Sequence, residues 1–283
     1  MNGYLVPSMA KKYLEHGIIT RYTELPRFPH CRAELLYTFL QRASEADRRN
    51  DCELLPLATT LMQVALDTHD MVSNPEAGVR GRGDRKTQLR VLAGDYFSSR
   101  FYQLLAQAGQ IDWVARLSDA ICEINRLKVS LYMKMKQLKL TAEEYLKSSV
   151  QIKSALFMAF THAFEGAYRK WWPEVLEAFT FCEVIADELE RSESPDGIEH
   201  SWTHWYLLQR GDWLPFNGWA SAGANGAELS GARSELRRLL EARCRHLSAL
   251  LSSIRSDKLA GELSRIAEPF VRKVSGAEVL EEI

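Results

Sequence analysis

The residues best suited to chemistry stand at the end of an apolar segment and in the basic loop that follows it. Asp67 and Asp70 are three residues apart, so on a helix they occupy neighbouring positions where two carboxylates can share a hard cation such as magnesium. The loop after them supplies cationic side chains that can hold diphosphate oxygens. These are Arg80, Arg82, Arg85 and Lys86. The layout is typical of a site for a phosphorylated ligand and a metal.

A plainer interpretation competes with this one. Short acidic clusters are common at helix ends, and a glycine-rich basic loop is often only a solvated surface loop. The loop contains no GxxxxGK[ST] phosphate-binding motif, and Gly81-x-Gly83 alone is a weak signal.

A histidine pair and a group of tryptophans each allow a functional and a structural interpretation. His200 and His204 have the spacing of metal ligands on one helical face, but no third ligand completes the pattern, so surface or partner-facing histidines are the commoner outcome. Four tryptophans follow closely, and burial in the core or at a subunit interface is favoured over a place at a membrane interface. They are Trp202, Trp205, Trp213 and Trp219.

Helices must position these residues, because apolar side chains recur at helical spacing along most of the chain. Leu54, Leu57, Leu61 and Ala65 predict a helix from about Glu53 to Val72, which Ser73-Asn74-Pro75 ends. Further helices are predicted from His30, over 87–107 and 112–137, from Thr141 past Phe164, from Pro173, and over 229–255 and 258–274. No series of alternating strands is present. The pattern predicts one all-α domain over 1–283, with a Trp- and Gly-rich irregular excursion at about 191–231.

The bulk composition narrows the function classes. The chain of 283 residues has 36 Lys and Arg against 37 Asp and Glu, which argues against a nucleic-acid-binding protein. No apolar run is long enough to span a bilayer, and the first residues lack the apolar stretch of a secretory signal. The five cysteines are scattered and odd in number, which is typical of reduced thiols, so a cytoplasmic location is expected.

Several phrases, in order, resemble the all-α trans-polyprenyl diphosphate synthases. Thr68-His69-Asp70-Met71-Val72 is followed by VLAGDYFSSRFY over 91–102, in the place of the first aspartate-rich motif and the helix after it. LTAEEYLKSSVQIKSALFMAF over 140–160 is similar to the stretch that carries a Lys-Thr pair, here Lys153-Ser154. FCEVIADELE over 181–190 resembles the second aspartate-rich motif. The resemblance implies the isoprenoid synthase fold.

The departures concern the metal ligands. In the family, carboxylates at i, i+1 and i+4 hold magnesium bridged to the allylic diphosphate. The first motif here keeps Asp70 but has Met71 and Asn74 in the other two positions, and methionine is a poor ligand for magnesium. The second motif reads Ala186, Asp187 and Glu190. The family's Gly-Gly-Lys-Arg is absent between residues 21 and 40, and its arginine pair is reduced to Val79-Arg80.

This pattern, with AICEINRLKVSLY over 120–132, is similar to the small, non-catalytic component I of two-component synthases, best to that of the heptaprenyl enzyme of menaquinone synthesis. The resemblance implies a regulatory subunit without catalytic residues. It also implies a partner with DDxxD motifs that binds magnesium and condenses isopentenyl diphosphate with farnesyl diphosphate. Helices 89–107 and 112–137 would face that partner. Residual contacts with diphosphate would involve Asp67, Asp70, Arg80, Arg82 and Lys153.

Two other classes of function stay open. The chain could be an active homodimeric isoprenoid transferase with a remodelled metal site. It could also be a helical interaction protein that docks through its tryptophans, and a peripheral membrane contact is compatible with each case.

Overall fold

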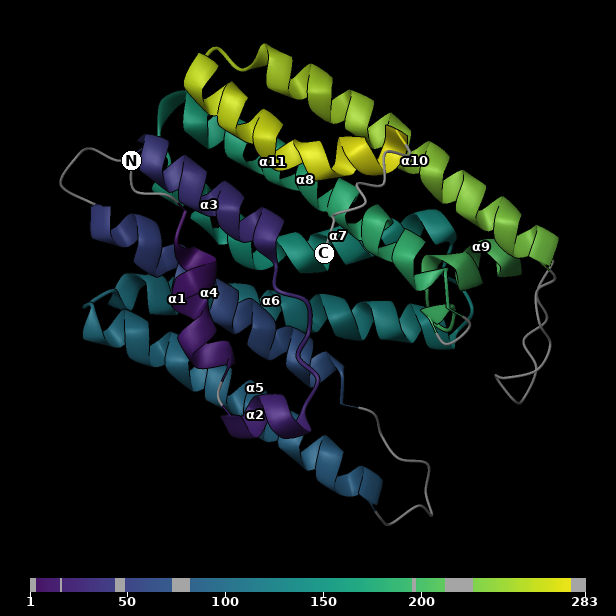
Figure 1. The fold of residues 1–283 in the computed structure, drawn as a ribbon, viewed down its shortest axis with the longest axis horizontal. Coiled ribbons are helices and arrows are strands. Elements are labelled where there is room, and N and C mark those ends of the chain that lie inside the picture. The colour runs from purple at the N-terminus through teal and green to yellow at the C-terminus, as the bar shows by residue number, and fades with distance from the viewer. Residues whose placement is uncertain are drawn as a thin grey trace, which may run out of the picture. The chain divides into compact units, whose positions relative to one another are not determined.

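The computed structural model describes residues 4–15, 17–43, 49–72, 82–194, 197–211 and 226–275. Within these ranges the regular structure is entirely helical (Figure 1), which confirms the all-α prediction. None of the described helices is long and apolar enough to cross a membrane. The helices are α1 (Val6–Leu14), α2 (Gly17–Tyr22), α3 (His30–Ala43), α4 (Arg49–Asp70), α5 (Arg82–Gln107), α6 (Ile111–Lys136), α7 (Ala142–Met158), the short 3₁₀ helix η2 (Ala159–Ala163), α8 (Gly166–Arg191), α9 (Trp202–Arg210), α10 (Gly226–Ser253) and α11 (Asp257–Ser275).

The chain divides into two compact units. Unit 1 comprises Met1–Ile121 and His162–Tyr168, and unit 2 comprises Cys122–Thr161 and Arg169–Ile283. Unit 1 therefore contains the first acidic motif, which begins at the end of α4. Unit 2 contains the second acidic motif, on α8. The expectation of one domain over the whole chain stays a prediction.

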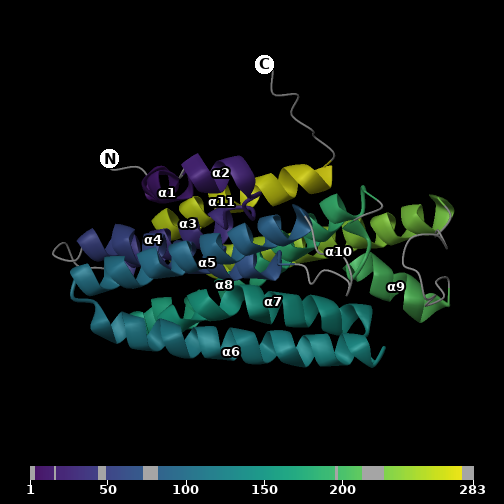
Figure 2. The same ribbon diagram turned by 90° about the horizontal axis from the view of Figure 1, so that it is seen from below.

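The core of unit 1 is built on α4. This helix contacts α1, α3 and α5, and Figure 2 shows α4 and α5 side by side. Leu57, Leu61 and Ala65 are buried as the helical spacing predicts. The facing side of α5 buries aromatic and aliphatic side chains at three- and four-residue intervals, namely Ala93, Phe97, Phe101 and Leu105. Two apolar faces thus meet and hold the end of α4 in place.

A close approach between α4 and α5 depends on one glycine. A Cβ atom at Gly94 would lie 2.6 Å from the Cε1 and Nε2 atoms of His69, so only glycine leaves room for the imidazole there. The Nε2 atom of His69, on α4, lies 3.5 Å from Oδ1 of Asp95, which follows Gly94 on α5. The orientation of His69, the neighbour of Asp70, is therefore set by α5.

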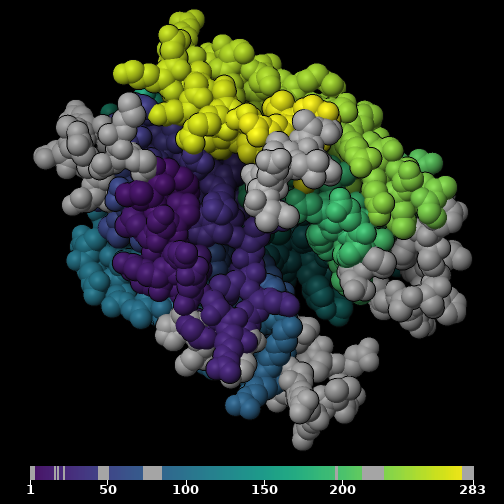
Figure 3. Space-filling view, in the orientation of Figure 1, coloured from purple at the N-terminus to yellow at the C-terminus, as the bar shows by residue number. Residues whose placement is uncertain are grey.

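Unit 2 packs several long helices around the apolar side of α8. Trp172, Leu176, Phe179 and Ile185 on α8 are fully or almost fully buried. Figure 3 shows α10 and α11 side by side on the surface of this unit, and the two helices are in contact. The apolar spacing of α11 buries Leu259, Leu263 and Ile266. In the same figure, α1 and α2 (purple) lie on the face of unit 1 that is turned toward the viewer.

The start of α7 confirms the capping box that was predicted from the sequence. Thr141 and Glu144 form the predicted capping box at the start of α7: the Glu144 N–H donates to Thr141 Oγ1 at 3.1 Å, and the Thr141 N–H donates to Glu144 Oε2 at 3.1 Å.

Three predicted boundaries were wrong. α5 begins at Arg82, so Arg85 and Lys86 belong to a helix and not to the basic loop. α8 begins at Gly166, which places Pro173 inside it instead of in its first turn. The predicted irregular excursion contains α9, in which Trp202, Trp205 and Leu207 are buried. At Pro173 and in α9, burial of the neighbouring apolar side chains outweighed a local helix-breaking signal.

We predict that Gly94→Ala destabilises the protein by about 1 kcal/mol, because the new methyl group forces the 38% exposed His69 side chain to swing away from Asp95. Urea denaturation measures this change. Gly231→Ala is the matched control: a Cβ there meets no atom within 4 Å, so it should stabilise α10 by up to about 1 kcal/mol. In a His69→Ala background, Gly94→Ala should stabilise like the control. Equal destabilisation in both backgrounds would contradict the steric explanation.

Candidate functional site

The end of α4 carries the first acidic motif in unit 1. Asp67 is half-buried and accepts a hydrogen bond of 2.8 Å from Gln63 Nε2, one turn earlier on the helix. Asp70 is exposed and is the last residue of α4. Arg80 and Asn74 lie outside the described residues, and Arg82 is the first residue of α5, with no description of its side chain. The structure therefore brings together only two of the predicted diphosphate contacts here.

A cation that sequence reasoning missed occupies the end of this helix. Arg90 Nη1 donates to the Met71 carbonyl at 2.8 Å, and Arg90 Nη2 lies 3.5 Å from Glu24 Oε2. Lys86 Nζ lies 3.6 Å from the same carboxylate. A guanidinium at a helix C-terminus satisfies a carbonyl that has no partner within the helix and favours the helix dipole. The four-residue spacing of Lys86 and Arg90, which places both cations on one face of α5, is the sequence feature that could have predicted this contact.

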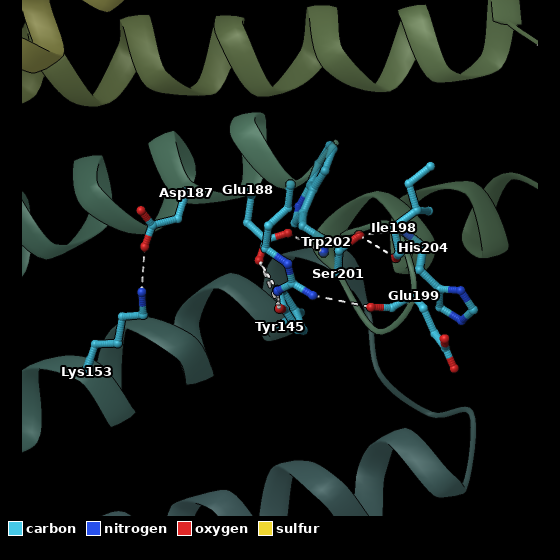
Figure 4. Close-up of polar contacts among 10 residues, drawn as sticks. Tyr145, Lys153, Asp187, Glu188, Ile198, Glu199, Ser201, Trp202 and His204 are labelled. Atoms are coloured by element: carbon cyan, nitrogen blue, oxygen red, sulfur yellow. Dashed lines mark hydrogen bonds and ion pairs between the residues drawn. The ribbon is translucent and has the colours of Figure 1, made fainter. Parts of the chain in front are cut away.

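The second motif, on α8 in unit 2, has lysines against both of its carboxylates. Lys153 Nζ on α7 donates to Asp187 Oδ2 at 2.6 Å (Figure 4). Lys273 Nζ on α11 donates to Glu190 Oε1 at 2.6 Å and reaches the Ala186 carbonyl at 3.3 Å. Because the two acids are three residues apart on one helix, α7 and α11 both attach to this short segment of α8. The Lys153 predicted as a diphosphate contact is thus an ion-pair partner.

Between these two pairs, Glu188 forms a buried hydrogen-bonded junction. Its side chain accepts from the Tyr145 hydroxyl at 3.0 Å, from Arg191 Nη1 at 3.0 Å, and from the Trp202 backbone N–H at 2.8 Å (Figure 4). Arg191 Nη2 also donates to the Glu199 carbonyl at 3.2 Å. Burial, followed by the charge of Glu188, raises the pKa of the Tyr145 hydroxyl well above its usual range, so the hydroxyl stays protonated and donates. The junction joins α7, α8 and α9.

The start of α9 is fixed by this junction. Ser201 caps the helix by accepting from the His204 N–H, and the carboxylate of Glu188 at the Trp202 N–H favours the positive end of the helix. Trp202 and Trp205 are buried, as the favoured interpretation predicts, and Trp202 stacks on Tyr206 with ring centroids 4.7 Å apart. Trp213 and Trp219 lie outside the described residues.

The histidine pair of this region does not assemble a metal site. The rings of His200 and His204 are 6.3 Å apart, and no group of three or more His, Cys, Asp or Glu side chains that could hold a metal occurs among the described residues. Burial, followed by the charge of His200, lowers the pKa of His204. His204 is therefore held in its neutral form.

The donor set of the second motif does not fit a magnesium ion. A metal would need the oxygens of Asp187 and Glu190, and both already bind ammonium groups at 2.6 Å. At the first motif, Asp70 is followed by Met71, whose thioether is too soft a ligand for magnesium. These residues are therefore poorly suited to hold a magnesium ion for catalysis.

We predict that Glu188→Gln destabilises the protein by about 2 kcal/mol, because the amide loses the charge that Arg191 and the Trp202 N–H bind. The 42% exposure of the Arg191 side chain keeps the cost below that of a fully buried pair. Chemical denaturation measures the change. Glu241→Gln, on an exposed pair with Arg245, is the control and should change stability by less than about 0.5 kcal/mol. A similar loss of stability in both variants would show that the charge of Glu188 does not stabilise the junction of α7, α8 and α9.

A second prediction concerns pH. Because folding lowers the pKa of His204, the unfolded chain binds a proton more readily than the folded chain. The contribution of His204 to stability is therefore complete above its ordinary pKa near 6.5 and is lost as the pH falls below it. His204→Gln should flatten the decline of the melting temperature between about pH 7.5 and 5.5. The exposed His246 on α10 provides the control, and His246→Gln should leave the decline unchanged. A decline identical in all three proteins would contradict the prediction.

Comparison with known proteins gives two partial matches in sequence. A model of the family "Heptaprenyl diphosphate synthase (HEPPP synthase) subunit 1" matches residues 16–200. Heptaprenyl diphosphate synthase component 1 of Geobacillus stearothermophilus is 41% identical over 85 residues, which are 30% of this chain and 36% of that relative. The matched stretch thus spans about a third of the relative's length.

Solved structures support the fold. A heptaprenyl diphosphate synthase from Staphylococcus aureus has a TM-score of 0.64 at 11% identity, over 95% of this chain and 96% of that chain. A geranylgeranyl pyrophosphate synthase from Lactobacillus brevis has a TM-score of 0.66 at 13% identity, over 94% and 96%.

A polyprenyl synthase from Caulobacter crescentus, complexed with calcium and isoprenyl diphosphate, has a TM-score of 0.63 at 17% identity, over 94% and 93%. These likenesses confirm the predicted isoprenoid synthase fold. The family match covers more than half of the residues, and it identifies the chain as a member of the heptaprenyl diphosphate synthase subunit 1 family.

Proposed function

We propose that this chain is a regulatory, non-catalytic subunit of a heteromeric heptaprenyl, or similar long-chain, diphosphate synthase. In this proposal it supports condensation of isopentenyl diphosphate with farnesyl diphosphate for the menaquinone side chain, in the cytoplasm. The observation that carries the proposal is the pairing of Asp187 and Glu190 with Lys153 and Lys273. The name of the relative, component 1, also supports a second subunit.

The chemistry explains why this pairing matters. Loss of diphosphate from an allylic carbon leaves negative charge that metal ions must stabilise, and the carboxylates that hold those ions must be available. Here a metal ion would have to displace an ammonium group from each acid of the second motif. The pairs are only about one-third exposed, so water screens them incompletely. The segment is therefore better suited to joining helices than to holding substrate charge.

The partner in this proposal carries complete DDxxD motifs and binds magnesium. α5 offers a surface for it, because Leu92 is 62% and Tyr102 43% exposed, with the smaller Ser99 and Ala106 exposed along the same side. Exposed large apolar side chains on one helix face are typical of protein interfaces. Contact with the substrate diphosphate by Asp67 and Asp70 remains compatible with the proposal, and the same holds for Arg80 and Arg82. Lys153 would first have to release Asp187.

The activity test uses purified chains. With radiolabelled isopentenyl diphosphate, farnesyl diphosphate and magnesium, we predict that this chain alone forms no prenyl product, because its second motif is occupied by lysines. A DDxxD-bearing synthase encoded beside it, tested alone, should form little long-chain product, and mixing the two chains should restore synthesis. Product from this chain alone would overturn the proposal in favour of an active homodimer.

The interface can be tested with the same pair. Leu92→Asp should reduce co-purification of the two chains and the restored activity together. Val271→Asp, at a 45% exposed position on α11, is the matched control and should reduce neither. Normal co-purification of the Leu92 variant would exclude this face of α5 as the contact.

A further inference from the structure

Two cysteine thiols from different helices of unit 2 contact each other. Cys182 lies on α8 and is fully buried, and Cys244 lies on α10 with 7% of its surface exposed. The Cys182 thiol donates a hydrogen bond to the sulfur of Cys244. Both residues are thiols in this structure, and no disulfide joins them. Because residues 183–243 lie between them in the chain, only the packing of the helices brings the two sulfurs together.

Two further contacts fix α8 against α10 in one register. The guanidinium of Arg243 lies over the Phe181 ring, with its Cζ 3.9 Å from the ring centre. Just beyond the other end of α8, Arg233 donates to the Ser192 carbonyl, from Nη2 at 2.6 Å and from Nε at 3.1 Å. The two contacts are 11 residues apart along α8 and 10 along α10, in opposite directions, which is about 15 Å along each axis. One antiparallel register therefore satisfies both contacts, and it sets the two thiols opposite each other.

The two thiols differ in reactivity, and Cys244 is the one that an oxidant meets first. It is the partly exposed member of the pair, whereas Cys182 has no surface in contact with solvent. The hydrogen bond from Cys182 lowers the pKa of the Cys244 thiol, against the opposing effect of burial. The thiolate is the form of cysteine that reacts with oxidants. Cys182 in turn lies where it can react with whatever forms on the Cys244 sulfur.

We propose that Cys182 and Cys244 are a redox modification site, at which a small hydroperoxide such as hydrogen peroxide forms a reversible disulfide. In the first step the Cys244 sulfur attacks one peroxide oxygen: an S–O bond forms, the O–O bond breaks, and water leaves. In the second step the Cys182 sulfur attacks the sulfenic acid: an S–S bond forms, the S–O bond breaks, and the Cys182 proton leaves with the oxygen as a second water. The two thiols lose two electrons, which the peroxide gains.

The disulfide ties α10 to α8 close to the second acidic motif, since Cys182 precedes Asp187 by five residues on the same helix. It closes a long loop of chain, so it restricts the unfolded state and stabilises the fold of unit 2. A buried cysteine can serve simply as a small apolar side chain, but such a role does not require two sulfurs to be in contact. This inference does not depend on the proposed function.

The test is treatment of the purified full chain with hydrogen peroxide, followed by thiol alkylation, proteolysis and mass spectrometry. Peptides that contain Cys182 and Cys244 should appear cross-linked, and dithiothreitol should release them. The melting temperature should rise by about 5 °C or more on oxidation and return on reduction. If no such cross-link has formed when the exposed Cys122 is fully oxidised, the proposal is wrong.

Alanine variants separate the roles of the two thiols. In Cys182→Ala, peroxide should leave a sulfenic acid on Cys244 that dimedone traps, whereas the wild-type chain should give little of this adduct because Cys182 consumes the sulfenic acid. Cys244→Ala should show neither the cross-link nor the rise in melting temperature. Cys52→Ala removes another buried thiol, in unit 1, and as the matched control it should keep both. A dimedone adduct on Cys182 in the Cys244→Ala variant, or loss of the rise in all three variants, would overturn the proposal.

Discussion

Glu188 places a carboxylate where water hardly reaches it, and much of unit 2 is arranged to compensate that charge. A buried carboxylate is costly unless charged or hydrogen-bonding groups surround it. Tyr145, Arg191 and the Trp202 N–H provide this compensation from α7, α8 and the start of α9. The helices are therefore held at one point by a requirement of charge, in addition to the burial of their apolar faces.

The two acids near Glu188 are also compensated by charged groups on other helices, and this bears on function. Asp187 and Glu190 obtain their counter-charges from lysines on α7 and α11. A segment of this kind can hold metal ions or hold helices, but the same carboxylate oxygens cannot serve both at once. At the end of α4, Arg90 similarly binds the carbonyl of Met71. In both acidic motifs protein cations satisfy polar groups, which agrees with the structural role proposed for them.

Local sequence signals were reliable where local physics decides the outcome. The capping box of Thr141 and Glu144 involves four residues only, and it formed as predicted. The apolar spacing of α4 was also sufficient, because burial of one face is the main source of helix stability in a folded chain. The signals misled at Pro173 and in the Trp-rich excursion. There, tightly packed helices tolerated a proline and ordered a short helix, and no window of sequence contains those contacts.

The sequence by itself determined the all-α class, the family resemblance and the loss of metal ligands at Met71 and Ala186, since these follow from residue identity and helical spacing. Only the tertiary structure decided what became of the acids that remain. The partners Lys153 and Asp187 are 34 residues apart, and Lys273 and Glu190 are 83 apart. Such pairs depend on how helices pack, and helical periodicity states which face is buried without stating which neighbour covers it. The loss of metal ligands can therefore be read from the sequence, whereas the pairing of the remaining acids with lysines is visible only in the fold.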